Sequence, residues 1–175
     1  MARDLLGKVL VREVGGEKLS GRLIEVEAYL APADLASHAA GGRRTPRTEV
    51  MFGAPGHAYV YFTYGMHFCL CFVTQSAGVP HAVLARALEP GPGVGRCSGP
   101  GLLTKSLGID RALNGAPLVP PDLYLVDDGE APRRVYTTPR TGISNTGVWE
   151  KRLLRFCWDS PFLSRPLSKK RKPGA

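Results

Sequence analysis

The sequence predicts a single α+β domain built around a curved, mostly antiparallel β-sheet with short helices. Apolar and β-branched residues recur in short runs with the period of two that is typical of strands. Gly and Pro number 21 and 15 in a chain of 175 residues, so turns should be frequent and long helices few. Short links between strands favour antiparallel pairing, because parallel neighbours need a crossover of a dozen or more residues.

The first half of the chain contains the clearest strands. Residues 2–12 predict the end of a short helix that leads into a strand, a start compatible with a longer natural chain. Residues 19–30 predict a strand that alternates between two faces. Its apolar face should pack on the core, which leaves two carboxylates and a tyrosine on the opposite face. The apolar face is Ile24, Val26 and Ala28, and the other is Leu23, Glu25, Glu27 and Tyr29.

The remaining elements are shorter. Residues 31–56 should be mostly loop, with a turn of helix at 33–39 that Asp34 starts. Residues 57–74 predict two aromatic-rich strands around a tight turn at Tyr64 and Gly65. A strand at 81–88 should end before Glu89 and Pro90. We further expect a helix at 101–109 and strands at 122–127, 135–140 and 151–158.

The composition is that of a folded, basic protein. Hydrophobic residues make up 43% and charged residues 22%, which excludes a wholly disordered chain. The net charge is +8, and residues 165–175 carry five of the 23 cations and no acid. We therefore expect a folded domain over 1–165 and a basic tail over 166–175. Such a balance is compatible with a polyanionic partner without requiring one.

Other features bear on location and metal binding. No run approaches the ~20 apolar residues that cross a bilayer, and no signal-peptide core is found, so a cytoplasmic protein without a membrane partner is expected. The four cysteines form no CxxC pair, which argues against a structural zinc site. We expect reduced thiols, with Cys69 and Cys71 on the same face of one strand.

Charged residues interrupt two of the predicted apolar strands. A buried, unpaired carboxylate is costly, so Glu27 should be exposed, ion-paired or functional. In one interpretation Glu25 and Glu27 line a solvated sheet face, or Glu27 and Arg86 form a bridge between strands. In another, Arg86 keeps Glu27 ionised so that it can align a water molecule. The residues alone leave these interpretations open.

Tyr64 differs from the other aromatic residues, which are more typical of a core than of a ligand platform. It stands at the predicted hairpin tip, where no core exists, and resembles a wedge for insertion between stacked bases. Arg43, Arg44 and Arg47 lie in a nearby Gly-containing loop and could hold phosphates, although solubility alone would also explain them.

Eight motifs in order carry a resemblance to a known family. They are Gly21–Leu30, His38, Gly42–Arg47, Tyr59–Met66, Arg86–Pro90, Cys97–Pro100, Arg140–Ile143 and Leu154–Phe156. Together they resemble the alkyladenine (3-methyladenine) DNA glycosylase family, over nearly the whole chain up to about residue 165. The resemblance implies a single mixed domain with a protruding β-hairpin, working as a monomer without metal or cofactor. It further implies a monofunctional enzyme of base-excision repair. Such an enzyme flips alkylated or deaminated purines out of double-stranded DNA and hydrolyses their N-glycosidic bond.

The resemblance also implies roles for individual residues. Glu27 would be the general base, with Arg86 and the main-chain carbonyl of Ile143 holding the attacking water. Tyr29 and Tyr61 would stack on the two sides of the extruded base, and His38 would contact its edge. Tyr64 would fill the gap left in the DNA. Residues near the DNA backbone or minor groove would be Arg43, Thr45, Met51 and Met66.

Two residues depart from the family pattern. Cys71 stands at a pocket position where family members have asparagine, which excludes normal guanine by crowding its amino group. Because cysteine is smaller and a weak hydrogen bonder, we expect a pocket that accepts some modified guanines. His67 stands where a tyrosine is common near the DNA, and a charged imidazole would favour phosphate at lower pH. No lysine falls at the matched pocket positions, so we expect a water nucleophile and no Schiff base.

Two other function classes fit parts of the sequence. A non-catalytic damaged-DNA-binding protein of the same fold would recognise lesions, but it would not need both Glu27 and Arg86. An unrelated small-molecule hydrolase could use Glu27 and His38, but it leaves Tyr64 and the arginine-rich loop unexplained.

Overall fold

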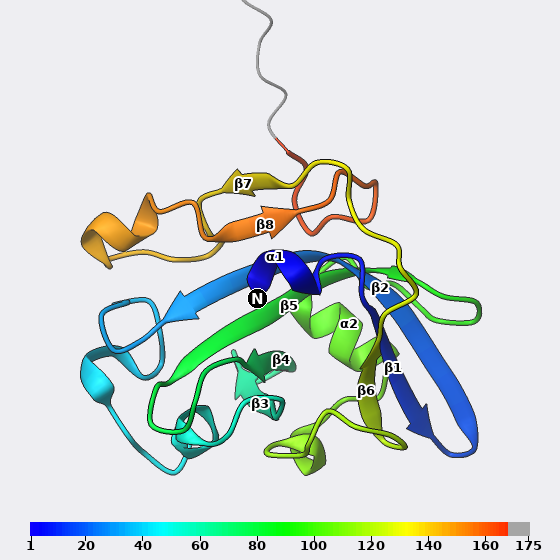
Figure 1. Ribbon diagram of the computed structural model, residues 1–175, viewed down its shortest axis with the longest axis horizontal. Helices are drawn as coiled ribbons and strands as arrows, with labels where there is room; N and C mark the ends of the chain where they lie inside the picture. The colour runs from blue at the N-terminus through cyan, green and yellow to red at the C-terminus, as the bar shows by residue number, and fades with distance from the viewer. Residues whose placement is uncertain (168–175) are drawn as a thin grey trace, which may run out of the picture.

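The computed structural model describes residues 1–167, which form a single α+β domain as predicted (Figure 1). Its strands are β1 (Val9–Val14), β2 (Glu17–Leu30), β3 (Ala58–Thr63), β4 (His67–Val73), β5 (His81–Pro90), β6 (Leu123–Val126), β7 (Tyr136–Thr138) and β8 (Arg155–Cys157). Its α-helices are α1 (Ala2–Leu5) and α2 (Pro100–Ser106). Its short 3-10 helices are η1 (Ala40–Gly42), η2 (Glu49–Phe52), η3 (Arg111–Leu113) and η4 (Gly147–Glu150).

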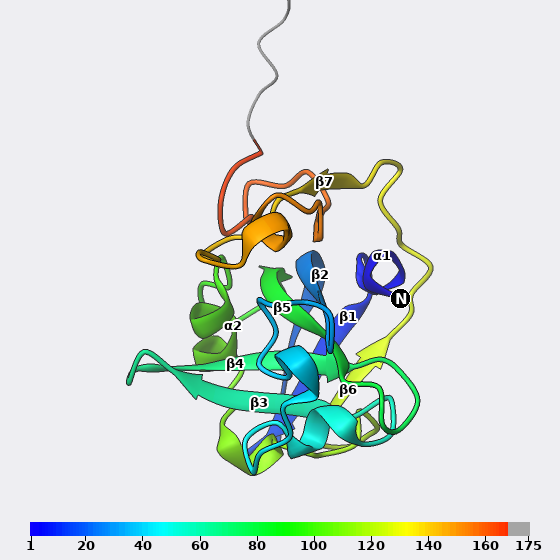
Figure 2. The ribbon, with the colours of Figure 1, turned by 90° about the vertical axis from the view of Figure 1, so that its left-hand side faces the viewer.

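The strands form one antiparallel sheet in the order β3-β4-β5-β2-β1-β6. Strand β8 pairs with the second half of β2 and with β7, which lies above the main sheet in Figure 1. Helix α2 packs against β4 and β5, where Leu103 and Leu107 join the main core cluster (Figure 2). Burial of this apolar surface is the main force that holds the sheet and helix together.

Two β-bulges interrupt the pairing of β2 with β5. Ile24 on β2 and Arg86 on β5 have no partner in the ladder. The pairs around them are Leu23–Leu88, Glu25–Ala87 and Val26–Ala85, so the second bulge restores the register that the first one shifts. Bulges redirect side chains and are common next to active sites.

Because of the bulge at Ile24, Leu23 and Ile24 lie on the opposite faces of β2 from those predicted. Leu23 packs with Val26 in the main core, whereas Ile24 packs in a separate cluster with Ala87, Cys157 and Leu163. Strict alternation predicted the reverse, because it has no place for an extra residue. Strand β8 and the segment around Leu163 cover the carboxylate face, so Glu25 and Glu27 are fully buried and do not line a solvated surface.

Strands β3 and β4 form a hairpin that protrudes from the domain (Figure 2). Its loop has three residues, 64–66, and not the tight two-residue turn predicted, because Thr63 pairs with His67. Tyr64 and Gly65 both have positive φ, 53° and 65°, which is unfavourable for a tyrosine. Tyr64 is 82% exposed at the tip.

Three other predictions were wrong in detail. Residues 33–39 turn without forming a helix, because Asp34 accepts hydrogen bonds from the amides of Leu30 and Ala36 and pairs with Arg140. Strand β5 continues to Pro90, because a proline is tolerated at a strand end. The last strand covers only 155–157, since η4 and a turn occupy the residues before it.

The predicted tail lies mostly outside the described residues. Among residues 1–167, none of the helices has both the length and the apolar character needed to span a bilayer.

Candidate active site

A cavity of about 860 Å³ opens between the β3–β4 hairpin, the loop of residues 35–51 and the loop of residues 141–146. Strands β4 and β5 contribute Cys69, Cys71, Leu84 and Arg86 to its lining. The lining combines aromatic and apolar side chains with polar ones, among them His38 and three arginines, so it can both stack on a ligand and bind it through hydrogen bonds.

The structure brings most of the predicted site residues to this cavity. Those that line it are Tyr29, His38, Arg43, Thr45, Met51, Tyr61, Tyr64, Cys71, Arg86 and Ile143. Glu27 lies directly behind the lining, in contact with Tyr29 and Arg86. Met66 and His67 are not part of the lining: Met66 is exposed at the hairpin tip, and His67 lies against Gly101 of α2. Met51 is only 2% exposed, so it lies in the cavity wall and not on the outer surface.

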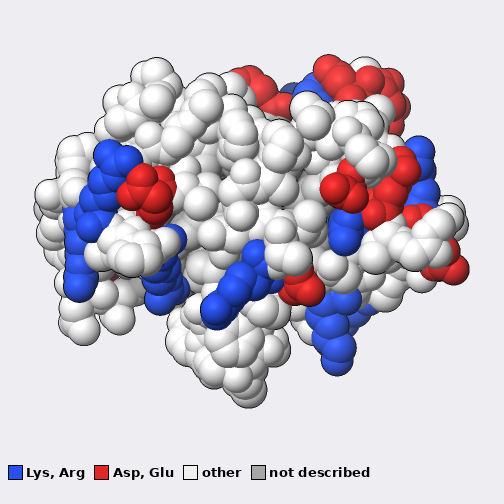
Figure 3. Space-filling model, turned by 90° about the horizontal axis from the view of Figure 1, so that it is seen from below, with Lys and Arg blue, Asp and Glu red and all other residues white. Residues whose placement is uncertain are grey.

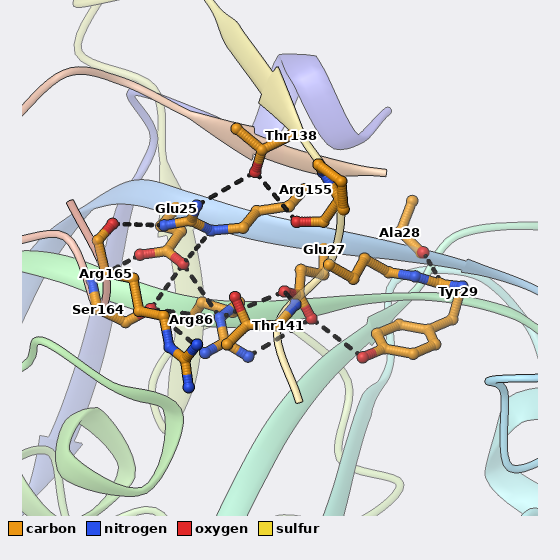
Figure 4. Close-up of polar contacts among 12 residues, drawn as sticks. Glu25, Glu27, Ala28, Tyr29, Arg86, Thr138, Thr141, Arg155, Ser164 and Arg165 are labelled. Atoms are coloured by element: carbon orange, nitrogen blue, oxygen red, sulfur yellow. Dashed lines mark hydrogen bonds and ion pairs between the residues drawn. The ribbon is translucent and has the colours of Figure 1, made fainter. Parts of the chain in front are cut away.

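The Glu27 carboxylate is held from three sides (Figure 4). The Thr141 amide donates to Oε1 at 2.7 Å, and the Tyr29 hydroxyl donates to Oε2 at 3.0 Å. Arg86 Nη1 lies 3.5 Å from Oε2. Burial raises the pKa of Glu27 above its ordinary value, although the Arg86 charge and the Thr141 amide oppose the shift. Raising the pKa of a carboxylate makes it a stronger base when it is ionised.

Arg86 lies between two buried carboxylates. Its Nε is 3.0 Å from Glu25 Oε1 and 3.4 Å from Glu27 Oε1. Glu25 also accepts from Arg155 Nε at 2.7 Å and from the amide and hydroxyl of Ser164 at 2.7 Å each. Burial alone would raise the pKa of Glu25, but the bonds from Arg155 and Ser164 outweigh it, so this pKa is lowered. The two carboxylates therefore have environments that suit different roles.

A second buried ion pair supports the cavity wall beside Glu27. Arg140 Nη2 donates to Asp34 Oδ1 at 2.8 Å, and Nη1 donates to the Ala28 carbonyl at 2.8 Å. The guanidinium carbon lies 4.5 Å from the centroid of the Tyr29 ring. Because Thr141 follows Arg140 in the chain, this pair also positions the amide that donates to Glu27.

Aromatic residues build the wall on the hairpin side. His38 Nδ1 lies 2.9 Å from the Tyr59 hydroxyl, and its ring meets Tyr61 edge-on with centroids 4.6 Å apart. Burial, with a smaller effect of Arg47, lowers the pKa of His38 to about 4, so the ring is neutral at pH 7. The tautomer with its proton on Nε2 accepts from the Tyr59 hydroxyl and keeps one N–H donor free.

Sequence analysis missed several residues of this site. Thr141 and Ser164 act through a backbone amide or a hydroxyl in loops, for which the sequence gives no signal. Arg140 did carry a signal, because it is the single cation of a predicted strand, as Arg86 is, whereas Arg155 stands beside Lys151 and Arg152 in the last predicted strand. All three of these arginines bind buried carboxylates.

Comparisons with known proteins agree with the geometry. Residues 1–161 match the family model for Methylpurine-DNA glycosylase (MPG). Similar curated proteins carry the name "Putative 3-methyladenine DNA glycosylase". One from Myxococcus xanthus (strain DK1622) is 46% identical over 180 residues, 99% of this chain and 92% of that protein. One from Legionella pneumophila (strain Lens) is 45% identical over 168 residues, 94% and 91% of the two chains. One from Desulfitobacterium hafniense (strain Y51) is 43% identical over 164 residues, 82% and 81% of the two chains.

The matched region contains Glu25, Glu27 and every predicted site residue. It confirms the predicted family and enzyme class. The chain belongs to the methylpurine-DNA glycosylase family and is an N-glycosyl hydrolase of DNA repair that acts on alkylated bases.

Proposed function

We propose that this glycosylase flips an alkylated or deaminated purine out of double-stranded DNA and hydrolyses its N-glycosidic bond with a water molecule that Glu27 deprotonates. The observation that carries the proposal is the position of Glu27. It is a fully buried carboxylate directly behind the cavity, with Arg86 beside it and the Thr141 amide on one of its oxygens. Burial raises its pKa, which is the usual preparation of a general base.

In the proposed reaction, the water oxygen forms a bond to C1′ of the sugar as the bond from C1′ to the base nitrogen breaks. The proton of the water passes to Glu27, and the bonding electrons leave with the base. Positive charge builds on the sugar during this step, so the anionic Glu27 stabilises it as well as activating the water. Arg86 opposes protonation of Glu27, and the main-chain carbonyl of Ile143 is the second group proposed to hold the water.

The aromatic wall supports the proposed binding of a damaged purine. Tyr29 and Tyr61 both line the cavity, and an electron-poor, positively charged base stacks well on such rings. A neutral lesion such as hypoxanthine leaves less readily and needs a hydrogen bond or a proton at the base. The free N–H of neutral His38 is the donor that we assign to the base edge.

Outside the cavity, the hairpin tip and the rim supply the proposed DNA contacts. Tyr64 is exposed on a loop that protrudes from the domain, as a side chain that fills the gap in the base stack should be. Arg43 and Thr45 belong to the cavity lining and are proposed phosphate contacts, and Met66 and His67 are proposed contacts beside the tip.

The lining also bears on the nucleophile and on the assembly. Among the described residues, those that line the cavity include no lysine, which supports water as the nucleophile and a monofunctional enzyme. We further propose that the enzyme acts as a monomer, as the family resemblance implies. We keep the cytoplasmic location expected from the sequence as part of the proposal.

The direct test is excision from duplex oligonucleotides that carry hypoxanthine, ethenoadenine or an N7-methylated purine, with alkali used to cleave the abasic product. We expect Glu27→Gln to lose about 10²–10⁴-fold in rate, the usual contribution of a general base, while DNA binding persists. Glu17→Gln, at the exposed start of β2, is the matched control and should excise normally. Excision that survives Glu27→Gln would refute the assigned base. Binding without excision by the unaltered enzyme would restore the non-catalytic interpretation.

A further inference from the structure

Ser164 lies beyond residues 1–161 that match the family model and is not part of the cavity lining, yet it contacts the carboxylate network directly (Figure 4). Its amide donates to Glu25 Oε2 and its hydroxyl donates to Glu25 Oε1, each at 2.7 Å. The same hydroxyl accepts from Arg86 Nη2 at 3.3 Å and from Nε at 3.4 Å. One hydroxyl thus joins the carboxylate and the guanidinium.

The neighbours of Ser164 fix it in this place. Leu163 is buried in the cluster that contains Ile24, Ala87 and Cys157. On the other side, Arg155 Nη2 donates to the carbonyl of Arg165 at 2.7 Å. A side chain held on both sides loses little further freedom when it forms hydrogen bonds.

The network needs such a residue because two carboxylates share one guanidinium. Arg86 Nε lies 3.0 Å from Glu25 and 3.4 Å from Glu27, so any increase in the pull of Glu25 draws Arg86 away from Glu27. The two donors of Ser164 satisfy oxygens of Glu25 without adding charge. They leave Arg86 free to face both carboxylates.

We propose that Ser164 is a positioning residue for the glycosylase reaction, which holds Arg86 between Glu25 and Glu27 so that Glu27 keeps its counter-charge. This inference rests on the proposed role of Glu27 as the base. It predicts an effect on the pH dependence of excision, because Arg86 is the charge that most strongly opposes protonation of Glu27.

The other groups that face Glu27 stay in place when the hydroxyl is removed. They are Glu25 and Tyr29 on β2, Arg155 and Cys157 opposite on β8, Cys71 on β4 and the Thr141 amide. Without the hydroxyl, Glu25 loses a donor and takes a larger share of Arg86. The pKa of Glu27 should then rise further, and the acidic limb of the rate profile should move to higher pH.

The experiment compares the full-length enzyme with Ser164→Ala, Ser164→Thr and Ser160→Ala. Single-turnover excision is measured across pH on a duplex with an N7-methylated purine, whose fixed positive charge removes the need to protonate the leaving base. Ser164→Thr keeps the hydroxyl. Ser160→Ala is the matched control in the same segment, because the Ser160 hydroxyl accepts only from the Phe162 amide at 3.3 Å among the contacts found within residues 1–167.

We expect Ser164→Ala to excise about tenfold more slowly at neutral pH, as the loss of one buried charge-assisted hydrogen bond predicts. Its acidic limb should lie at higher pH, its DNA binding in gel shifts should be unchanged, and the other two variants should match the unaltered enzyme. An unchanged rate and acidic limb in Ser164→Ala would overturn the proposal. So would equal losses in Ser164→Ala and Ser160→Ala, which would indicate a merely structural role. Failure of the Glu27 assignment is recognised separately, by excision that survives Glu27→Gln.

Discussion

Glu25 and Glu27 stand two residues apart on one strand and are both fully buried, but their pKa values shift in opposite directions. The reason is the number and quality of the donors. Glu25 accepts four hydrogen bonds of 2.7–3.0 Å from Arg86, Arg155 and Ser164. Glu27 accepts one at 2.7 Å, one at 3.0 Å and one long contact at 3.5 Å from Arg86. The ion that is less well satisfied is the one beside the cavity.

This difference predicts that Glu27→Gln stabilises the protein while it abolishes excision. The folded-state pKa of Glu27 is raised, so this residue contributes stability only below its ordinary pKa, and the contribution is lost as the pH rises through the folded value. At neutral pH the ionised side chain therefore costs stability, and the amide removes that cost. We expect a gain of about 1 kcal/mol, or about 2–4 °C in Tm for a chain of this size, measured by thermal unfolding.

Glu25→Gln is the control, for which the expected change in stability has the opposite sign. The lowered pKa of Glu25 means that its contribution is present above its ordinary pKa and is lost as the pH falls through the folded value. Breaking this buried cluster should cost about 3–5 kcal/mol at neutral pH. The advantage of Glu27→Gln should shrink as the pH falls through the raised folded-state pKa of Glu27, and it should be gone below pH 4.5, the ordinary value of the group. A Tm of Glu27→Gln below that of the unaltered enzyme at pH 7 would contradict this account.

Cys71 is the residue from which we predict the lesion preference of the enzyme. It is 4% exposed, lines the cavity and pairs with Tyr59 across the hairpin. Burial raises the pKa of its thiol well above the ordinary value, so it presents a small, neutral surface. We expect Cys71→Asn to slow excision of 3-methylguanine about tenfold, because the larger polar amide crowds the amino group of the base, with hypoxanthine excision as the control. An equal 3-methylguanine rate in both proteins would show that Cys71 does not set this preference.

At the scale of elements, the tip of the β3–β4 hairpin contains a residue whose backbone conformation destabilises the folded protein. Tyr64 has a φ of 53°, a left-handed conformation that a tyrosine adopts at a cost of about 1 kcal/mol, and little of its side chain is buried in return. A residue kept in an unfavourable conformation on an exposed tip is better explained by a contact with a partner than by folding.

We therefore expect Tyr64→Asn to leave the Tm unchanged or slightly raised, since asparagine tolerates positive φ. The short polar side chain cannot fill a gap between stacked bases, so lesion binding and excision should fall about tenfold. Tyr64→Trp keeps a large aromatic side chain and should retain most of the activity. The measurements are gel shifts and single-turnover rates. Normal excision by Tyr64→Asn would exclude the wedge role.

The elements themselves were mostly predictable, because strands β2 to β5 carry strong apolar and aromatic patterns. The bulge in β2 was not, and the reason is local. Leu23 and Ile24 are both large and apolar, so exchanging their faces leaves no trace in the polarity pattern. The bulge at Arg86 could not be predicted either. A cation within an apolar strand indicates that an acidic partner lies nearby, but it does not indicate that the strand pairing is interrupted. Ser164 was invisible because its role depends on a contact across 139 positions of sequence.

At the scale of the whole molecule, charge is distributed unevenly. On the face shown in Figure 3, Lys and Arg lie on both sides of an uncharged lobe, and most acidic side chains gather toward one end. Cations in and around β1, β2 and β6 pair with acids, as in Lys18–Glu13 and Arg22–Asp128. By contrast, within residues 1–167 no carboxylate oxygen lies within 4.0 Å of Arg43 or Arg47. The positive charge near the cavity is therefore the part available to a polyanion, which a net charge alone could not reveal.

The two bulges between β2 and β5 let the direction of the catalytic side chains differ from the one that regular strand pairing would impose. Because one bulge cancels the other, every pair beyond Val26–Ala85 continues the register set before Leu23–Leu88. A sheet that lacked both Ile24 and Arg86 would keep all of its other partners, whereas removal of either one alone would slip half of a strand to the wrong face. In the pairing of the strands Arg86 is thus an extra residue, so its side chain can be directed at the two buried carboxylates without a change in the register around it.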